Sequence, residues 1–195
     1  MQQHTTIPPI HTLILGGQKS GKSRQAEMLA RDWLAAAPTH RATLIATAEA
    51  HDAEMAARIA QHQADRAQRV PQLQTVEEPL ALAERIQTLS SPSTLLVVEC
   101  LTLWLTNQLM PVDSTQTQSP AQVQAAIAEL SRTLRAAPGP VVFVSNEISL
   151  GIIPLMPAVR QFVDQLGLLN QSMASQCQRV LLMAAGLPLA LKAAS

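Results

Sequence analysis

Residues 16–23 read Gly16-Gly17-Gln18-Lys19-Ser20-Gly21-Lys22-Ser23 and match the pattern G-x-x-x-x-G-K-[ST] of a phosphate-binding loop (P-loop). Such a loop must point its backbone N–H groups at a phosphate, and glycines allow the backbone angles and the close approach that this requires. The motif follows a predicted strand and opens a predicted helix, whose positive N-terminal end attracts anions. This context favours a nucleotide phosphate site over a chance match in a glycine-rich turn.

Two side chains of the loop have defined tasks in nucleotide chemistry. We expect Lys22 to reach the β- and γ-phosphates and the Ser23 hydroxyl to bind Mg²⁺. P-loop enzymes also hold the metal with a carboxylate at the end of a buried strand, and Glu99 closes the apolar run Leu-Leu-Val-Val. The alternative is that Glu99 only caps the next helix. Glu147 is a second acid at a strand end, on the sheet edge where open α/β folds bind ligands.

Apolar runs alternate with helical segments along the chain, which is typical of a parallel α/β sheet. We therefore predict a P-loop NTPase-type three-layer sandwich with a mostly parallel central sheet. The predicted strands are Thr12–Leu15, Ala42–Thr47, Leu95–Glu99, Val141–Ser145 and Val180–Met183. The predicted helices are Lys22–Ala36, Asp52–Arg66, Pro79–Ser90, Pro120–Ala136 and Val159–Ser175, and the polar segment Val112–Ser119 is expected to be a mobile loop.

The composition limits the class of partner. Fourteen Lys and Arg residues balance fourteen Asp and Glu, and this zero net charge argues against a nucleic-acid-binding protein. Charged residues make up only 14% of the chain, against roughly 25% in an average soluble domain. A surface so poor in charge is often partly buried against other subunits, so we expect a homo-oligomer.

The length of 195 residues predicts one domain over the whole chain, with residues 1–11 flexible. Cys100 and Cys177 offer neither a metal-ligand spacing nor a disulfide framework, which indicates two reduced, buried thiols. Residues 1–11 lack the apolar core of a signal peptide, and the apolar stretch 180–191 is too short to span a bilayer. We expect a cytoplasmic protein without stable membrane insertion.

The predicted helix 52–66 carries an unusual histidine. Met55, Ile59 and His62 share one face at spacings of four and seven residues, and His62 also ends a neighbouring polar stripe with Glu54 and Arg58. Spacing alone favours a half-exposed histidine at the edge of an apolar face. His51, at the helix start, is equally eligible for a functional role on this ground.

Several blocks beyond the P-loop occur in a specific order. They are Gly-Gly-Gln-Lys-Ser-Gly-Lys-Ser-Arg at 16–24, Ile-Ala-Thr-Ala at 45–48, Asp-Ala-Glu-Met-Ala-Ala-Arg-Ile-Ala-Gln-His at 52–62, Thr-Val-Glu-Glu-Pro at 75–79, Glu-Cys-Leu-Thr-Leu-Trp-Leu-Thr-Asn at 99–107, Ser-Asn-Glu-Ile-Ser-Leu-Gly-Ile-Ile-Pro at 145–154, and Arg160, Phe162, Asp164, Gly167 and Asn170-Gln171. From about residue 12 to residue 192, the chain resembles the bifunctional adenosylcobinamide kinase / adenosylcobinamide-phosphate guanylyltransferase family of cobalamin biosynthesis.

The resemblance implies two reactions. The family phosphorylates the hydroxyl of the aminopropanol arm of adenosylcobinamide with a nucleoside triphosphate, ATP or GTP. It then transfers GMP from GTP to that phosphate through a guanylylated histidine, which gives adenosylcobinamide-GDP. The family histidine follows Arg-Ile by three positions, which places it at His62 and not at His51. Relatives assemble into trimers or hexamers, and the corrinoid is expected at the carboxyl edge of the sheet or between subunits.

The same matching implies the site residues. Lys22 and His62 would be catalytic, and Ser23 and Glu99 would hold Mg²⁺. The nucleotide would be surrounded by the P-loop residues Gly16, Gly17, Gln18, Lys19, Ser20, Gly21, Lys22 and Ser23, and by Ala46, Thr47, Ala48, Gln63, Ala64, Asp65, Arg66, Glu77 and Glu99. Arg24 is a further candidate for contact with phosphate or substrate, and its alternative is a solvated first-turn arginine.

The chain departs from the family pattern at two places. Leu73 stands where relatives often have Trp, and Gln18-Lys19 replaces a common Ala-Arg.

Two other functions remain open. A plain P-loop small-molecule kinase would leave His62 idle and would usually need an Arg-rich lid, whereas residues 101–131 contain no Arg. A nucleotide-binding regulatory module without turnover would also suit a charge-poor oligomer, but a DNA motor would need a basic patch.

Overall fold

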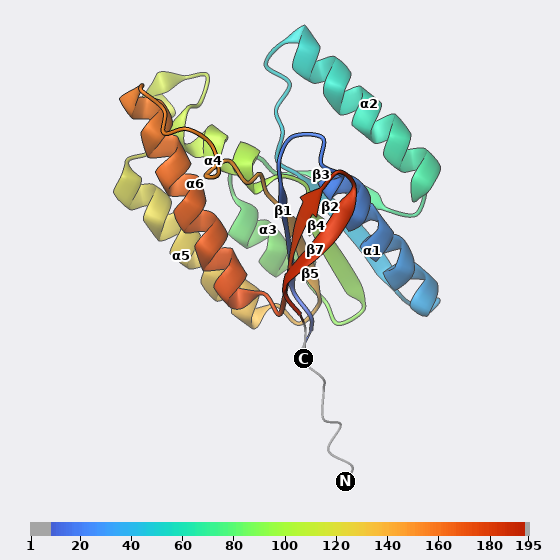
Figure 1. The fold of residues 1–195 in the computed structure, drawn as a ribbon. Coiled ribbons are helices and arrows are strands. Elements are labelled where there is room, and N and C mark those ends of the chain that lie inside the picture. Colours follow the sequence, from blue (N-terminus) through green and yellow to red (C-terminus); the bar gives the residue numbers. More distant parts are fainter. Residues whose placement is uncertain (1–8, 194–195) are drawn as a thin grey trace.

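The computed structural model describes residues 9–193. A seven-stranded sheet forms the centre of the molecule, with the strand order β3-β2-β4-β5-β1-β6-β7 (Figure 1). All neighbouring strands pair in parallel except β6 and β7, which form an antiparallel hairpin at one edge. The strands are β1 (Thr12–Gly16), β2 (Arg41–Ala46), β3 (Gln74–Glu77), β4 (Thr94–Val98), β5 (Val141–Val144), β6 (Arg179–Ala184) and β7 (Leu187–Lys192).

Helices cover both faces of the sheet, which gives the predicted three-layer α/β architecture (Figure 1). Alternate residues of the central strands point to opposite faces: Leu13 and Phe143 pack beneath one helical layer, and Ile14 and Val142 pack against the other. Burial of each of these large side chains stabilises the folded state by about 1.5–3 kcal/mol relative to leaving the side chain exposed. The helices are α1 (Lys22–Ala36), α2 (Ala53–Arg69), α3 (Leu82–Leu89), α4 (Leu101–Leu109), α5 (Pro120–Ala136) and α6 (Pro157–Gln176), with α1 on one face and α3, α4, α5 and α6 on the other.

Helices with strong local signals lie where they were predicted. Helix α1 spans its predicted residues because Gly21, with a φ of +101°, ends the P-loop and starts the helix. Helix α5 also has its predicted bounds, since Ser119 and Gln122 form a reciprocal capping box and Pro120 takes the first helical position. Helix α3 begins at Leu82 and not at Pro79, because the Glu78 carboxylate accepts the N–H groups of Leu80 and Ala81 and holds a turn there.

Four elements were not predicted: one α-helix, two edge strands and one short 3₁₀-helix. Helix α4 is buried on nearly all sides, so its apolar residues show no amphipathic period. Strand β3 is a polar, largely exposed edge strand, and every residue of the opposite edge strand β7 is exposed. Neither edge shows the buried apolar run by which the inner strands were recognised. Within the expected loop 112–119, a short 3₁₀-helix (Ser114–Gln116) is capped by the Asp113 carboxylate.

Both cysteines are free, and burial raises the pKa of each thiol, to about 12 for Cys177. Cys177 is buried and Cys100 is half-buried at the start of α4. Within residues 9–193, no helix has the length and the apolar content that a membrane crossing requires. Residues 1–8 of the segment expected to be flexible lie outside the described residues, whereas His11 is buried beside β1.

His11 is a neutral histidine that holds two elements together. Its Nδ1 accepts a hydrogen bond from the Val141 N–H at the start of β5, at 3.2 Å. Burial lowers its pKa to about 4, although a hydrogen bond to the Leu134 carbonyl partly opposes this shift. The folded protein therefore keeps His11 uncharged at pH values where the unfolded chain already takes up a proton.

We predict that the free energy of unfolding falls as the pH drops from about 6.5, the ordinary histidine pKa, towards 4. The loss from this residue amounts to about 3 kcal/mol, and none of it occurs above the ordinary pKa. Urea unfolding of the wild type and of His11→Asn at several pH values measures the effect. Asn can accept the same N–H bond without titrating, so this variant should lose less stability on acidification. Equal losses in both proteins would contradict a neutral, buried His11.

Candidate nucleotide-binding and transferase site

The P-loop follows β1 and has a backbone that only glycine permits at its two ends. Gly16 has a φ of +151°, and a Cβ there would lie 2.6 Å from both the Met183 carbonyl oxygen and Ser20 Oγ. Gly21 has a φ of +101° and precedes the first turn of α1. Lys19, with a φ of 55°, is a non-glycine residue in the left-handed region. These angles produce the tight turn that the motif requires.

The β6–β7 hairpin supports this loop from the side. The hairpin turn at Ala185 and Gly186 has positive φ at both residues, as a two-residue turn of this kind needs. The Gly186 N–H donates to the Ser20 carbonyl at 3.0 Å, and the Gly186 Cα limits the space beside Gly21. The sequence signal that could have predicted this hairpin is the dipeptide Ala185-Gly186 between two apolar runs.

The inner surface of the loop fits an anionic group. Lys22 is buried, and its Nζ donates to the Gly17 carbonyl at 2.7 Å. Burial lowers the pKa of Lys22, and the Arg58 guanidinium lowers it further, whereas Cys100 opposes the shift. Ser20 Oγ is buried and has no hydrogen-bond partner in the described part of the chain. A lysine desolvated beside an unpaired hydroxyl and the N-terminus of α1 is suited to bind phosphate.

Glu99 lies at the carboxyl end of β4, two strands away from β1 because β5 pairs between them. Its N–H donates to the Ile45 carbonyl at 3.0 Å, which fixes the backbone at this point. The carboxylate lies 3.5 Å from Arg66 Nη1 and 3.9 Å from His62 Nδ1. The structure thus brings together the strand-end acid and the histidine that the family resemblance singled out.

Arg66 has a role that the sequence did not reveal. Its side chain is only 5% exposed, pairs with Glu99 and donates from Nη2 to Thr75 Oγ1 at 3.3 Å. Arg66 therefore fixes Glu99 and joins α2 to strand β3. Sequence analysis had placed Arg66 around the nucleotide only by resemblance, and no local pattern distinguishes a buried arginine of this kind.

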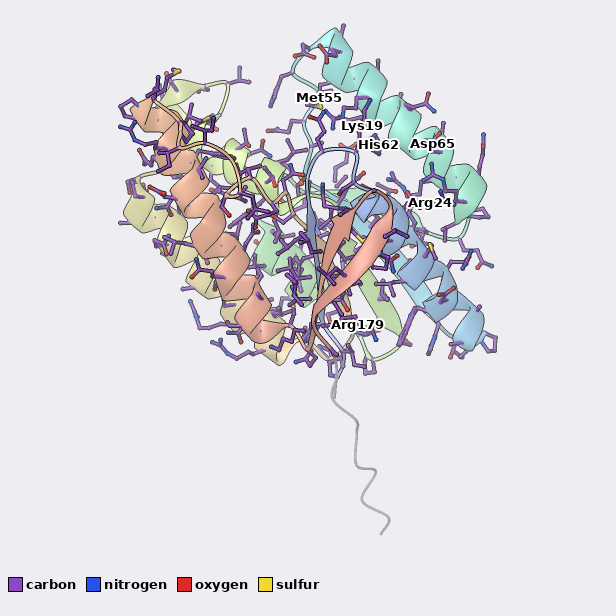
Figure 2. The ribbon with its side chains drawn as sticks, viewed as in Figure 1. Lys19, Arg24, Met55, His62, Asp65 and Arg179 are labelled. Atoms are coloured by element: carbon purple, nitrogen blue, oxygen red, sulfur yellow. The ribbon has the colours of Figure 1, made fainter. Side chains whose placement is uncertain are left out.

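Helix α2 presents His62 to this edge of the sheet. The Asp52 carboxylate caps the helix by accepting the Met55 N–H at 2.7 Å, and Arg66 is its one buried residue. Met55, His62 and Asp65 lie on the side of α2 that faces the rest of the molecule (Figure 2). The His62 side chain is 46% exposed, which leaves it accessible to a ligand. His51, before the helix, is exposed and lies 3.5 Å from Glu49.

The other residues expected around the nucleotide fall into two groups. Ala46, Thr47 and Ala48 follow β2 at the carboxyl edge, where Thr47 is buried, its Oγ1 donates to the Cys100 carbonyl and its own carbonyl accepts from the Asn107 amide. Glu77 ends the neighbouring β3, opposite Ala46, and is exposed. On α2, Gln63 and Ala64 are exposed, whereas Asp65 pairs with Arg69 at 3.0 Å.

The donor set fits Mg²⁺ as a partner of a bound phosphate. Ser23 lies half-exposed in the first turn of α1, and Glu99 supplies a single carboxylate. No group of three His, Cys, Asp or Glu side chains is gathered for a metal within residues 9–193. Mg²⁺ commonly takes one or two protein oxygens and completes its shell with phosphate oxygens and water. The residues present are therefore compatible with this ion.

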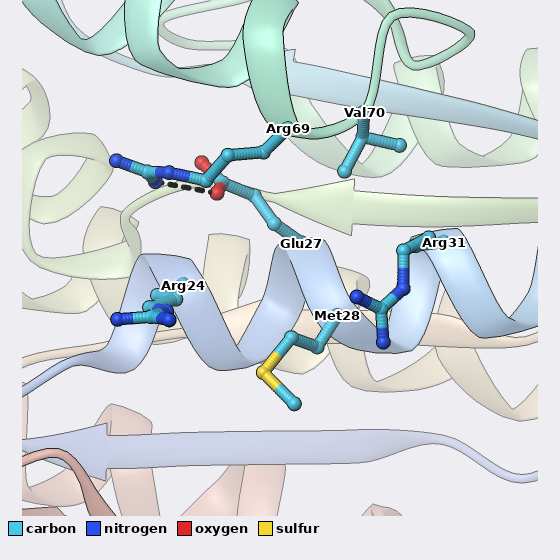
Figure 3. Close-up of a pocket in the computed structure, with 6 residues that line it drawn as sticks. All are labelled: Arg24, Glu27, Met28, Arg31, Arg69 and Val70. Carbon is cyan, nitrogen blue, oxygen red and sulfur yellow. Dashed lines mark hydrogen bonds and ion pairs between the residues drawn. The ribbon is translucent and has the colours of Figure 1, made fainter.

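A cavity of about 290 Å³ lies between α1 and the end of α2 (Figure 3). Arg24, the further phosphate candidate, is exposed and lines this cavity together with Arg31 and Arg69. Arg69 donates to the Glu27 carboxylate at 2.7 Å, and this hydrogen bond raises the pKa of Arg69. The cavity joins two helices and involves none of the P-loop residues 16–23.

Comparison with known proteins places this site in a family. Residues 12–191 match the family model described as cobinamide kinase / cobinamide phosphate guanyltransferase. The bifunctional adenosylcobalamin biosynthesis protein CobP of Pseudomonas aeruginosa is 44% identical over 180 residues, which cover 92% of this chain and 96% of that protein. CobU of Escherichia coli, named as a bifunctional adenosylcobalamin biosynthesis protein, is 34% identical over 92% of this chain and 98% of its own length.

Solved structures support the fold. The flagellar accessory protein FlaH from Methanocaldococcus jannaschii has a TM-score of 0.52 with 13% sequence identity, over 96% of this chain and 80% of that one. The match to the family model and the similarity to CobP both extend over nearly the whole chain, including the P-loop, Glu99 and His62. The chain belongs to the cobinamide kinase / cobinamide phosphate guanyltransferase family.

Proposed function

We propose that the chain phosphorylates adenosylcobinamide with a nucleoside triphosphate and then transfers GMP from GTP to adenosylcobinamide phosphate through a guanylylated His62. The observation that carries this proposal is the position of His62, 3.9 Å from the strand-end carboxylate of Glu99, in a fold that also forms a P-loop. A plain kinase has no use for a histidine at this place. The family membership supports both activities.

In the kinase step, the chain's main task is to bind and orient phosphates. The P-loop N–H groups and Lys22 hold the β- and γ-phosphates while the hydroxyl oxygen of the aminopropanol arm attacks the γ-phosphorus. The bond between that phosphorus and the bridging oxygen breaks, the nucleoside diphosphate leaves, and the hydroxyl proton passes to water. Ser23 and Glu99 would hold Mg²⁺, which supplies positive charge to the phosphate oxygens when bound.

In the transferase step, the His62 imidazole is the nucleophile. A nitrogen of the neutral imidazole attacks the α-phosphorus of GTP, and the Glu99 carboxylate, 3.9 Å from Nδ1, is close enough to stabilise positive charge that develops on the ring. Pyrophosphate leaves and a phosphoramidate remains. A phosphate oxygen of adenosylcobinamide phosphate then attacks the same phosphorus, the N–P bond breaks and the histidine is released.

The remaining site residues surround GTP in this proposal. Lys22 and the P-loop would bind phosphates. Ala46, Ala48, Glu77 and the exposed residues Gln63 and Ala64 would surround the rest of GTP, with the buried Thr47 fixing the backbone between Ala46 and Ala48. Asp65 and Arg66 act mainly through their ion pairs, with Arg69 and Glu99 respectively. We further propose a homo-trimer or homo-hexamer in the cytoplasm, which would cover part of the charge-poor surface.

The guanylyl-histidine can be detected directly. We predict that purified protein, incubated with Mg²⁺ and GTP labelled at the α-phosphate but without corrinoid, acquires acid-labile, alkali-stable label. His62→Ala should carry none, because the nucleophile is missing, and His51→Ala should be labelled as the wild type is. Absence of label in the wild type with GTP binding intact would leave a plain kinase as the better account, and label in His62→Ala would exclude His62.

The pairing of Arg66 with Glu99 can be tested through stability. Arg66→Met leaves a mostly buried carboxylate without its counter-charge, so we predict a loss of about 2–3 kcal/mol in the free energy of unfolding. Arg132→Met is the matched control: Arg132 pairs with Glu129 on the surface, and its loss should cost less than about 1 kcal/mol. Urea unfolding of both variants measures the difference. Equal, small losses would contradict a structural role for Arg66.

A further inference from the structure

The segment from Ile148 to Met156, between β5 and α6, is the most exposed apolar stretch of the described chain. It contains no charged residue, and its apolar side chains project into solvent. Ile152 is 98% exposed, Leu155 is 92% exposed and Leu150 is 83% exposed. Exposed patches of this kind usually mark a place where an apolar partner or ligand binds.

The segment has a defined shape despite this exposure. At its start, the Glu147 carboxylate accepts hydrogen bonds from both the N–H and the hydroxyl of Ser149. At its end, Arg160 Nη1 donates to the carbonyls of Pro154 at 2.9 Å and Leu155 at 2.7 Å. The segment and the start of α6 line an open cavity of about 240 Å³, to which the segment contributes mainly apolar residues and α6 contributes Arg160, Val163 and Asp164.

The start of the segment adjoins the P-loop. The Glu147 N–H donates to the carbonyl of Gly16, the first residue of the P-loop, at 3.0 Å. The segment leaves the sheet at its carboxyl edge directly beside β1, because β5 pairs with β1. In Figure 1 the segment and helix α2 lie on opposite sides of the P-loop. A molecule seated on the segment can therefore extend one arm to the phosphates from the side that α2 and His62 leave open.

We propose that the segment 148–156 and its cavity bind the corrin ring of the substrate, an inference that rests on the proposed function. A corrin carries methyl groups and neutral amide arms at its rim, so an uncharged apolar surface suits the ring. Asp164 and Arg160, which line the same cavity, can accept from and donate to the amide arms. The segment itself carries no cation, and Arg160, the cation in the cavity lining, already donates from Nη1 to the carbonyls of Pro154 and Leu155, which argues against a second nucleotide at this place.

The cavity accepts one edge of the ring, since a whole corrin is several times larger than 240 Å³. The exposed side chains of Ile152 and Ile153 extend the contact beyond the cavity. Seating one edge of the ring on this segment leaves the aminopropanol arm free, and the arm carries the hydroxyl that must reach the γ-phosphate. The corrin would thus be held by the segment after β5, and the nucleotide by the P-loop and the ends of β2, β3 and β4.

The test uses the double variant Ile152→Ser/Ile153→Ser in the full chain. Its matched control is Leu189→Ser, which alters an exposed leucine on β7, away from the segment. Kinase kinetics with adenosylcobinamide should show a KM at least about tenfold higher for the double variant than for the control, because apolar contact with the ring is lost. Labelling of His62 from GTP needs no corrinoid and should be unchanged in both.

Two results would overturn the proposal. One is an unchanged KM in the double variant. The other is a change in the sedimentation of the double variant with parallel loss of labelling and kinase turnover, which would make the segment an interface between copies of the chain. Equilibrium dialysis with adenosylcobinamide, followed by its absorbance, tests binding without turnover. If the wild type binds adenosylcobinamide and the double variant does not, the site is supported. This holds even if the wild type transfers no phosphate or GMP, and in that case only the proposed function fails.

Discussion

The hydrogen bond from the Gly186 N–H to the Ser20 carbonyl and the positive φ angles of Gly16 and Gly21 hold residues 16–21 in the tight turn of the P-loop, on which the proposed phosphate site depends. The turn is fixed on three sides: β1 leads into it, α1 leads out of it, and the β6–β7 hairpin packs against it. Any side chain at Gly16 would collide with the neighbouring strand. These contacts, with the hydrogen bond from Lys22 Nζ to the Gly17 carbonyl, orient Lys22 and the N-terminus of α1 in the absence of a ligand.

The strand order determines where the other candidate site residues lie relative to this turn. Strand β5 separates β1 from β4, so Glu99 lies two strands away from the P-loop and beside β2, whose end carries Ala46 to Ala48. Helix α2 places His62 next to Glu99, and the segment after β5 begins at the opposite side of the loop. The nucleophile proposed for the transferase step and the surface proposed for the corrin therefore lie on two different sides of the P-loop.

Much of this arrangement follows from local sequence. The P-loop, the inner strands and helices α1 and α5 have strong signals, namely glycines at required positions, continuous apolar runs and a capping box. Helix α4 was not predicted because burial on nearly all sides removes the amphipathic period of its sequence. Strands β3 and β7 were not predicted because edge strands need no continuous run of buried apolar residues. His62 was singled out by family resemblance, since spacing left it equal to His51. The ion pair of Arg66 with Glu99 depends on the packing of α2 against the sheet, which no local pattern reveals.

The central claim is that one phosphate site serves both reactions. It is tested most directly by measuring, in a single Lys22→Ala preparation, phosphate transfer to adenosylcobinamide and labelling of the protein from α-labelled GTP. Arg31→Ala is the control, because Arg31 lies on the same helix but pairs with Asp32 in solvent. The account predicts that Lys22→Ala loses both activities by a similar factor while the control keeps both. Persistence of either activity near the wild-type level in Lys22→Ala would contradict a shared site.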